Sequence, residues 1–569
     1  MNHNNVCYRL FTACCRPKLL YFYYLIAFML PNVGLTITEP MGTMACISNL
    51  LLPAGLYALL LTLSRKPGKM IWILFPFVFF AAFQLVLLYL FGRSVIAVDM
   101  FLNVVTTNPG EAIELLDNLV PGVAGVFIVY LPALLLGICS LRMKEQLEHT
   151  FLTKARRWSA GALAAGLLCF GLTYLVEPGY TARKELYPLN ASYNLYLAIE
   201  RTNKQIHYAE TSRNFRFQAT STHHDSTETY VLVIGETARA CNFTLYGYER
   251  DTNPQLSQIE GLLTFRDALT QSNTTHKSVP MLLSGASAED FDRIYQEKSL
   301  ITAFREAGFY TLFLSNQRPN HSFIDFFGME ADEYHFLQED QPGEEIPSDA
   351  DLLKGVEQTL NQHHPKLLIV LHAYGSHFNY RERYPRSMAF FTPDDQTDAK
   401  FKNRTSLINA YDNSLRFTDD ILGKLTSLLT AHGGTAAWIY TSDHGEDLFD
   451  DSRRRFLHAS PVPTYYQIHV PLWIWLSTDY QMQHATKVEA LQAHTSQPVS
   501  TSLSLFHTLL QLGGLSTPIL TDTLSLCSPH FRPVPRCYLD DHNRPVPLQK
   551  LDLTDEDREQ FHRHGLVYD

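Results

Sequence analysis

Residues 230–254, YVLVIGETARACNFTLYGYERDTNP, carry the strongest indication of the fold. They begin with the apolar run Tyr230–Ile234, which is typical of a strand buried on both faces. The run ends at Gly235, and the carboxylate of Glu236 follows at once. In open α/β sheets ligands bind just beyond the carboxyl ends of the strands, so Glu236 lies where a functional site is expected. A polar residue after one strand is usually only part of a loop, so the interpretation depends on later residues that could converge on Glu236.

The region after Tyr230 alternates predicted strands with predicted helices. Strands are expected at Tyr230–Ile234, Tyr310–Leu314, Leu367–Leu371, Ala437–Thr441 and Leu472–Leu476. Helices are expected at Leu300–Ala307, Asp351–Asn361, Thr405–Leu429 and Ser500–Leu512. Strands separated by helices indicate βαβ units and a mainly parallel sheet covered on both faces. We therefore predict an α/β domain over residues 230–569.

The first 176 residues contain five apolar segments, each near the ~20 residues that cross ~30 Å of hydrocarbon. They are Leu19–Ile37, Met44–Leu63, Ile71–Phe91, Leu119–Leu141 and Ala160–Val176. Lys and Arg gather before the first segment, between the second and third, and between the fourth and fifth. By the positive-inside rule the amino terminus is cytoplasmic and everything after Val176 lies outside. We therefore predict an α-helical membrane domain with five spans over residues 1–176.

Charge is divided unevenly along the chain. The first 180 residues hold 12 Lys and Arg against 8 Asp and Glu, whereas the rest hold 34 against 49. Nucleic-acid binding needs a basic surface, so the acidic second part argues against it, and we expect no nucleic-acid partner. Residues 177–229 show no strong periodicity and are predicted to form a linker, with Leu186–Ile199 as a candidate helix at the membrane surface and Ser221–Thr229 as a flexible polar segment.

Three of the nine cysteines lie in the predicted outer domain, namely Cys241, Cys527 and Cys537. Cys527 and Cys537 flank the proline-rich segment SPHFRPVPR. An oxidising compartment would let these two form a disulfide, which leaves Cys241 over. We therefore predict a bond between Cys527 and Cys537.

The segment TSDHGE, residues 441–446, is the strongest candidate for metal binding, because it follows a predicted strand directly. The side chains of Asp443 and His444 could both ligate one metal ion. Together with Glu236 they would form a set of oxygen and nitrogen ligands that suits zinc. An isolated motif of this kind more often caps the next helix, so its value depends on the other candidates.

Hydroxyl groups and further histidines complete the candidate chemistry. The segment SNTTHKSVP, residues 272–280, contains several hydroxyls. A hydroxyl bound to a metal ion loses its proton far more readily than a free one and becomes a nucleophile at neutral pH. The loops LHAYGSH and LHASP add His377 and His458. Taken singly, such residues belong to turns and satisfied structural contacts as often as to sites.

The order of these motifs resembles the bacterial phosphoethanolamine transferases, which belong to the alkaline phosphatase and sulfatase superfamily. The resemblance rests on five spans followed by GETAR, TTHKSVP, GSH, SDHGE and LHASP over nearly the whole chain. It implies an alkaline phosphatase-like α/β/α sandwich for the outer domain. It also implies a bacterial inner-membrane location, with the catalytic domain in the periplasm.

The resemblance further implies roles for individual residues. The zinc ligands of the family fall on Glu236, Thr275, Asp443 and His444. Thr275 would be the nucleophile, and its spacing to Ser278, Val279 and Pro280 selects it over Thr274. Three more family positions fall on His377 and His458, which would bind substrate phosphate or a second zinc ion, and on Asn316, which would line the site.

The implied reaction is a two-step in-line displacement. Thr275 would attack the phosphorus of phosphatidylethanolamine, release diacylglycerol and carry phosphoethanolamine to an acceptor, either lipid A or the lipopolysaccharide core. Many members that modify lipid A have cysteines where this chain has Gln271 and Met281, and Asn273 replaces the first Thr of the loop. These departures leave the ligands in place and the choice of acceptor open.

Three other functions remain compatible with the motifs. One is a phosphoglycerol transferase of the same superfamily, which Arg239–Phe243 and Gly247-Tyr248 fit less well than they fit the phosphoethanolamine branch. Another is a membrane-bound phosphodiesterase or sulfatase-like hydrolase. The last is a non-catalytic scaffold, against which the complete set of ligands argues.

Overall fold

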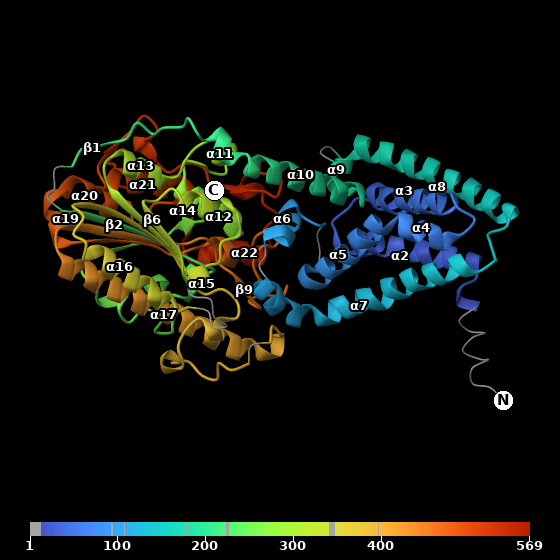
Figure 1. Cartoon of the computed structure of the whole chain (residues 1–569), viewed down its shortest axis with the longest axis horizontal. Helices are drawn as coiled ribbons and strands as arrows, with labels where there is room; N and C mark the ends of the chain where they lie inside the picture. Colours follow the sequence, from blue (N-terminus) through green and yellow to red (C-terminus); the bar gives the residue numbers. More distant parts are fainter. Residues whose placement is uncertain are drawn as a thin grey trace. The chain divides into compact units, whose positions relative to one another are not determined.

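The computed structural model describes residues 13–92, 95–106, 109–177, 180–223, 227–340, 347–396 and 398–568. The chain divides into two compact units. The first, here called the helical unit, is Met1–Val105 with Leu115–Arg201, and the second, the α/β unit, is Thr106–Glu114 with Thr202–Asp569. Figure 1 shows the elements of each unit.

The helical unit carries the predicted membrane spans. The helices that cover its apolar segments are α2 (Pro17–Thr38), α3 (Thr43–Leu61), α4 (Pro67–Ile73), α5 (Phe75–Phe91), α7 (Pro109–Arg142) and α8 (His149–Val176). Within the described residues, α2, α3, the Val120–Arg142 part of α7 and α8 are long and apolar enough to cross a membrane. A fifth span arises if α4 and α5 count as one. The described residues thus hold four such helices, or five.

The predicted third span is bent rather than straight. Helices α4 and α5 meet at Leu74 with a bend of 69°. Pro76 lies in the first turn of α5. A proline has no N–H to donate and its ring clashes with the carbonyl four residues earlier, so a continuous helix through Pro76 is disfavoured. The apolar segment predicted at Ile71–Phe91 is therefore covered by two helices rather than one.

The α/β unit is built on a seven-stranded sheet of order β3-β11-β8-β2-β7-β5-β6. The strands are β3 (Leu262–Phe265), β11 (Leu472–Leu476), β8 (Thr435–Ser442), β2 (Glu228–Gly235), β7 (Lys366–His372), β5 (Tyr310–Ser315) and β6 (Glu333–Phe336). The five strands from β8 to β6 run parallel, whereas β11 is antiparallel to both its neighbours. The predicted mainly parallel sheet is confirmed, and all five predicted strands lie in it.

Helices cover both faces of this sheet (Figure 1). One layer contains α12 (Thr275–Leu283), α13 (Leu300–Glu306), α14 (Phe323–Gly328) and α21 (Thr501–Leu512). The other contains α16 (Leu352–Leu360) and α17 (Arg404–His432). Strand β2 lies at the centre: Tyr230 and Leu232 pack in the first layer, and Val231 packs in the second. Every residue of β2 is buried, as its unbroken apolar run predicts.

The register of the central strands brings their carboxyl ends to one edge of the sheet. Ile234 in β2 lies opposite Thr441 in β8 and opposite His372 in β7. His372 in turn lies opposite Ser315 in β5. The loops after these four strands therefore start side by side. That edge is where the candidate site forms.

Residues 202–229, which the sequence interpretation assigns to a linker, group with the α/β unit. Helix α10 (Leu189–Ile206) covers most of the predicted surface helix, and Arg201 and Thr202 inside it mark the division between the units. Tyr208 and Phe217 are buried in the core of the α/β unit. Strand β1 (Thr220–Ser221) pairs with β13 (Leu515–Ser516).

Because of this packing, we expect the amino-terminal boundary of a soluble fragment to affect its stability. A fragment starting at Thr227 lacks Tyr208 and Phe217, and loss of a large buried aromatic side chain costs about 3–5 kcal/mol. A fragment starting at Thr202 keeps both. Urea unfolding of the two fragments should show a clearly lower midpoint for the shorter one. Equal midpoints would mean that residues 202–226 add nothing to the core.

The predicted disulfide between Cys527 and Cys537 is wrong, because both are free cysteines in the structure. Cys527 is buried, its Sγ lies 3.7 Å from the Thr508 carbonyl oxygen, and burial raises the pKa of its thiol to about 12. Cys537 begins β14 (Cys537–Leu539) near Glu289; burial and that carboxylate raise the pKa of its thiol. The fold places the two thiols in different surroundings, and the short distance between the two cysteines in the sequence does not predict this.

Candidate metal centre and nucleophile

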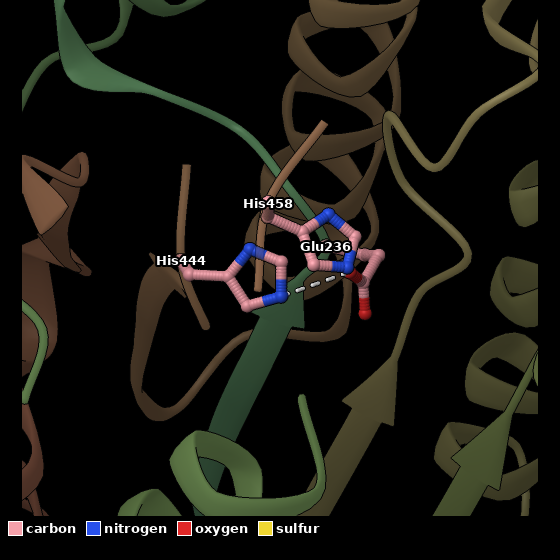
Figure 2. Close-up of side chains that lie close together, drawn as sticks. All are labelled: Glu236, His444 and His458. Atoms are coloured by element: carbon pink, nitrogen blue, oxygen red, sulfur yellow. Dashed lines mark ion pairs between the residues drawn. The ribbon is translucent and has the colours of Figure 1, made fainter. Parts of the chain in front are cut away.

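Three potential ligands meet at the carboxyl edge of the sheet. One ligand atom from each of Glu236, His444 and His458 lies within 4.8 Å of the others (Figure 2). Glu236 follows β2, and His444 follows β8. His458 follows the short strand β10 (Phe456–Leu457), which pairs with β9 (Asp447–Leu448). Glu236 and His444 are buried, and His458 is half-buried.

Thr275 and Asp443 complete the cluster. The Thr275 hydroxyl lies 3.3 and 3.2 Å from the two carboxylate oxygens of Glu236 and 3.2 Å from His444 Nε2. Asp443 Oδ2 lies 3.2 Å from the same His444 nitrogen. The four residues predicted as zinc ligands therefore come together in the structure. His458, predicted for substrate or a second metal, joins the same group.

Only one of the two adjacent threonines faces this cluster. Thr274 is the N-cap of α12, and its hydroxyl lies 3.1 Å from Ser272 Oγ. Thr275 is the first residue of the helix. The turn into the helix separates the two side chains, and it places Thr275 against Glu236.

Contacts behind the ligands fix their orientation. His444 Nδ1 lies 3.0 Å from the Gly445 carbonyl oxygen, and His458 Nδ1 lies 2.9 Å from Glu446 Oε2. The Nε2 atom of each ring is then left for the cluster, an arrangement common among metal-binding histidines. Glu446 also accepts a hydrogen bond from the Tyr380 hydroxyl. The sequence analysis missed this role of Glu446, although the residue lies within the SDHGE motif.

The electrostatics of the cluster favour a bound cation. Burial, reinforced by the Asp443 carboxylate, raises the pKa of Glu236 well above its usual value. Burial also raises the pKa of Asp443 to about 6 and lowers the pKa of His444 well below its usual value. Holding two carboxylates beside neutral imidazoles out of water raises the free energy of the folded protein unless a positive charge balances the carboxylates.

The donor set suits zinc. Oxygen and nitrogen donors of this kind bind zinc at about 2.0–2.2 Å in a tetrahedral arrangement, which places ligand atoms about 3.3–3.6 Å apart. Thr275 Oγ1 and the nearer ligand atoms of Glu236 and Asp443 lie 3.2–3.5 Å from His444 Nε2. The spacing among the side chains is therefore close to that of a zinc site.

The Asn316 amide nitrogen bonds to groups outside the cluster. Its side chain donates to the Pro347 carbonyl and to Asp349 Oδ1, both at 2.8 Å, and not to the cluster. The Asp349 carboxylate in turn accepts hydrogen bonds from the backbone N–H groups of Tyr374 and Gly375. Asn316 thus supports the loop that follows β7. That Asn316 also lines the site stays a prediction.

The neighbouring residue contacts the site instead. Gln317 Nε2 donates to Glu236 Oε2 and to the Ala373 carbonyl, each at 3.1 Å. The only signal in the sequence was the position of Gln317, three residues beyond the end of the strand predicted at Tyr310–Leu314. Which of two adjacent amide side chains turns toward the ligands depends on the loop conformation, which the sequence pattern does not report.

His377 lies at the side of the cluster. Its ring centroid is 6.4 Å from that of His458 and 5.1 Å from that of Tyr374. Its Nδ1 lies 2.7 Å from the Phe378 carbonyl oxygen, and burial lowers its pKa to about 3. A neutral imidazole beside His458 is compatible with substrate or metal binding, and its role stays a prediction.

Known proteins resemble this chain over much of the α/β unit. The family profile described as Sulfatase matches residues 228–515. The phosphoethanolamine transferase EptA of Salmonella typhimurium is 32% identical over 298 residues, which cover 50% of this chain and 53% of that protein. The chain thus spans about half the length of the curated relatives it matches.

Solved structures share the fold. The integral membrane lipooligosaccharide phosphoethanolamine transferase A of Neisseria meningitidis aligns with a TM-score of 0.72 at 19% identity, over 90% of this chain and 98% of that one. The periplasmic domain of Escherichia coli EptC, crystallised with Zn, aligns with a TM-score of 0.53 at 24% identity, over 60% and 97%. The predicted architecture, apolar helices followed by an α/β domain, is confirmed.

Proposed function

This chain belongs to the sulfatase family, and we propose that it acts as a zinc-dependent phosphoethanolamine transferase. The donor is phosphatidylethanolamine, and the acceptor is lipid A or the lipopolysaccharide core. The observation that carries the proposal is the Thr275 hydroxyl, held within 3.3 Å of Glu236 and His444. The aligned relatives named phosphoethanolamine transferases support the choice of the transferred group.

In this mechanism Thr275 is the nucleophile. Its hydroxyl donates toward the Glu236 carboxylate, which would take up the proton as the oxygen attacks the donor phosphorus. The new bond from Thr275 to phosphorus forms as the bond to diacylglycerol breaks, which leaves phosphoethanolamine on Thr275. A phosphate or hydroxyl oxygen of the acceptor then displaces Thr275. Zinc held by Glu236, Asp443, His444 and His458 would favour the ionised hydroxyl and stabilise negative charge on the phosphoryl oxygens.

The helical unit fits substrates that are lipids. Its described helices include four that could cross a membrane, or five if the bent pair is one span. One span would suffice to anchor a domain, so the larger number suits a protein that takes both donor and acceptor from a membrane. We place the protein in the bacterial inner membrane, with a cytoplasmic amino terminus and the α/β unit in the periplasm.

The test is a transfer assay with the full chain in lipid. Phosphatidylethanolamine labelled in its head group, mixed with lipopolysaccharide and zinc, should yield labelled lipopolysaccharide. Chelation of zinc should stop the transfer, and added zinc should restore it. The Thr275→Ala variant is the matched control.

The same assay separates the alternatives. Release of free phosphoethanolamine with unlabelled lipopolysaccharide would indicate a hydrolase. Label that moves only from phosphatidylglycerol would indicate a phosphoglycerol transferase. Either result would overturn the proposal, and mass spectrometry of the labelled product would assign the acceptor.

A further inference from the structure

The side chain of Gln467 connects the loops that carry the site. Gln467 lies on the short helix α18 (Tyr465–Ile468) and is 1% exposed. Its Nε2 donates to Asp447 Oδ2 at 2.8 Å and to the Leu457 carbonyl at 3.2 Å. These partners lie three residues after His444 and one residue before His458.

The oxygen of the same amide holds the nucleophile loop. Gln467 Oε1 accepts from Asn273 Nδ2 at 2.7 Å and from Ser460 Oγ at 2.9 Å. Asn273 lies two residues before Thr275. A primary amide has two N–H donors and two oxygen lone pairs, so all its hydrogen-bonding positions are used. The backbone carbonyl of Gln467 also accepts from Gly445 N–H at 2.8 Å.

Asn273 makes a second connection between the nucleophile loop and the His458 loop. Its carbonyl oxygen accepts from Ala459 N–H at 3.2 Å, and its Nδ2 donates to the Ser460 carbonyl at 2.9 Å. Its Oδ1 accepts from the Tyr538 hydroxyl at 2.7 Å. Asn273, Ser460 and Tyr538 are buried, so loss of a partner among them would leave an unpaired polar atom out of water.

We propose that Gln467 is a positioning residue: one buried amide sets the places of Thr275, His444 and His458 relative to one another before zinc or substrate binds. It touches no ligand atom itself. It acts through Asn273, through the Gly445–Asp447 segment and through the Leu457–Ser460 segment. The hydrogen-bonding pattern carries the proposal; the zinc-affinity and kinetic readouts below rest on the proposed function, whereas the hydrogen-exchange readout does not.

Two replacements of Gln467 test different parts of the contact set. Gln467→Glu keeps the size and the accepting oxygen but places an acceptor against Asp447 Oδ2 and the Leu457 carbonyl. Gln467→Met keeps the approximate size and removes all four side-chain hydrogen bonds. If either fails to fold, Asn273→Ala removes the hydrogen bond from the nucleophile loop to Gln467, together with those to the Ser460 carbonyl and the Tyr538 hydroxyl. Tyr465→Phe, on the same helix, is the matched control, because it loses one buried hydrogen bond, to His469 Nδ1, that does not reach the site.

The first readout is hydrogen exchange in the metal-free full chain. Both Gln467 variants should speed exchange of the Gly445 and Ala459 amides about tenfold or more, and Asn273→Ala should do so for Ala459. Tyr465→Phe should leave both amides unchanged. This readout needs neither zinc nor activity, so it stands even if the proposed transfer is wrong.

The second readout combines zinc affinity and kinetics. Residues that orient metal ligands typically cost 10–100-fold in affinity or activity when replaced, so both zinc affinity and kcat should fall by about that factor, with KM little changed. Tyr465→Phe should keep all three values. Unchanged exchange at Gly445 and Ala459 in folded Gln467→Met, or wild-type zinc affinity in both Gln467 variants, would overturn the proposal.

Discussion

Thr275→Ala is expected to abolish phosphoethanolamine transfer while zinc stays bound. The variant removes the only hydroxyl described within 3.3 Å of both Glu236 and His444, and loss of a covalent nucleophile typically costs roughly 10⁴-fold or more in kcat. Glu236, Asp443, His444 and His458 remain to hold the metal. Transfer of labelled head group, together with zinc content of the purified variant, measures both effects.

Two further variants act as controls for this assignment. Thr275→Ser should keep part of the activity, because the hydroxyl remains although its rotamer is less restricted. Thr274→Ala should have a mild effect, since the Thr274 hydroxyl contacts Ser272 rather than the cluster. Peptide mapping of protein trapped with donor should find phosphoethanolamine on Thr275. Finding it on Thr274, or finding activity in Thr275→Ala, would disprove the assignment.

Glu236→Gln is expected to lower activity by at least about 10³-fold and yet to stabilise the metal-free protein. The amide keeps the shape of the carboxylate but removes the charge that would bind zinc. In the folded metal-free chain, burial and Asp443 raise the pKa of Glu236 above its unfolded value. The stability that Glu236 contributes is therefore present below the unfolded pKa of about 4.3 and is lost as pH rises toward the folded pKa.

Thermal unfolding of metal-free protein from pH 4 to pH 8 measures this effect. The wild type should lose stability as pH rises more steeply than Glu236→Gln, and at pH 7 the variant should melt roughly 1–3 °C higher. Zinc should raise the Tm of the wild type much more than that of the variant. Glu333→Gln is a control for which the expected change in Tm at pH 7 is a decrease. A hydrogen bond from His335 lowers the pKa of Glu333, so the ionised carboxylate stabilises the folded protein at that pH. A lower Tm for metal-free Glu236→Gln would contradict the account.

The sequence by itself determined the elements and the chemical composition of the site. Strand β2 could be predicted because a strand buried on both faces needs an unbroken apolar run, and Glu236 comes directly after it. Asp443 and His444 follow β8 for the same reason. Parallel strands end at one edge, so the convergence of these loops could be expected from strand order alone. The apolar helices were equally predictable, because their length and composition are local properties.

Only the tertiary structure decided which side chains within those loops meet. Leu457 and Ala459, on either side of His458, both have positive φ angles, of 70° and 58°, which residues other than glycine rarely adopt. No local pattern predicts that turn, which brings His458 to Glu236 and His444. Gln317 rather than Asn316 reaches Glu236, and Gln467 connects loops that are far apart in sequence. Hydrophobic periodicity reports whether a residue is buried, whereas contacts between polar side chains depend on loop dihedrals and on segments packed from elsewhere in the chain.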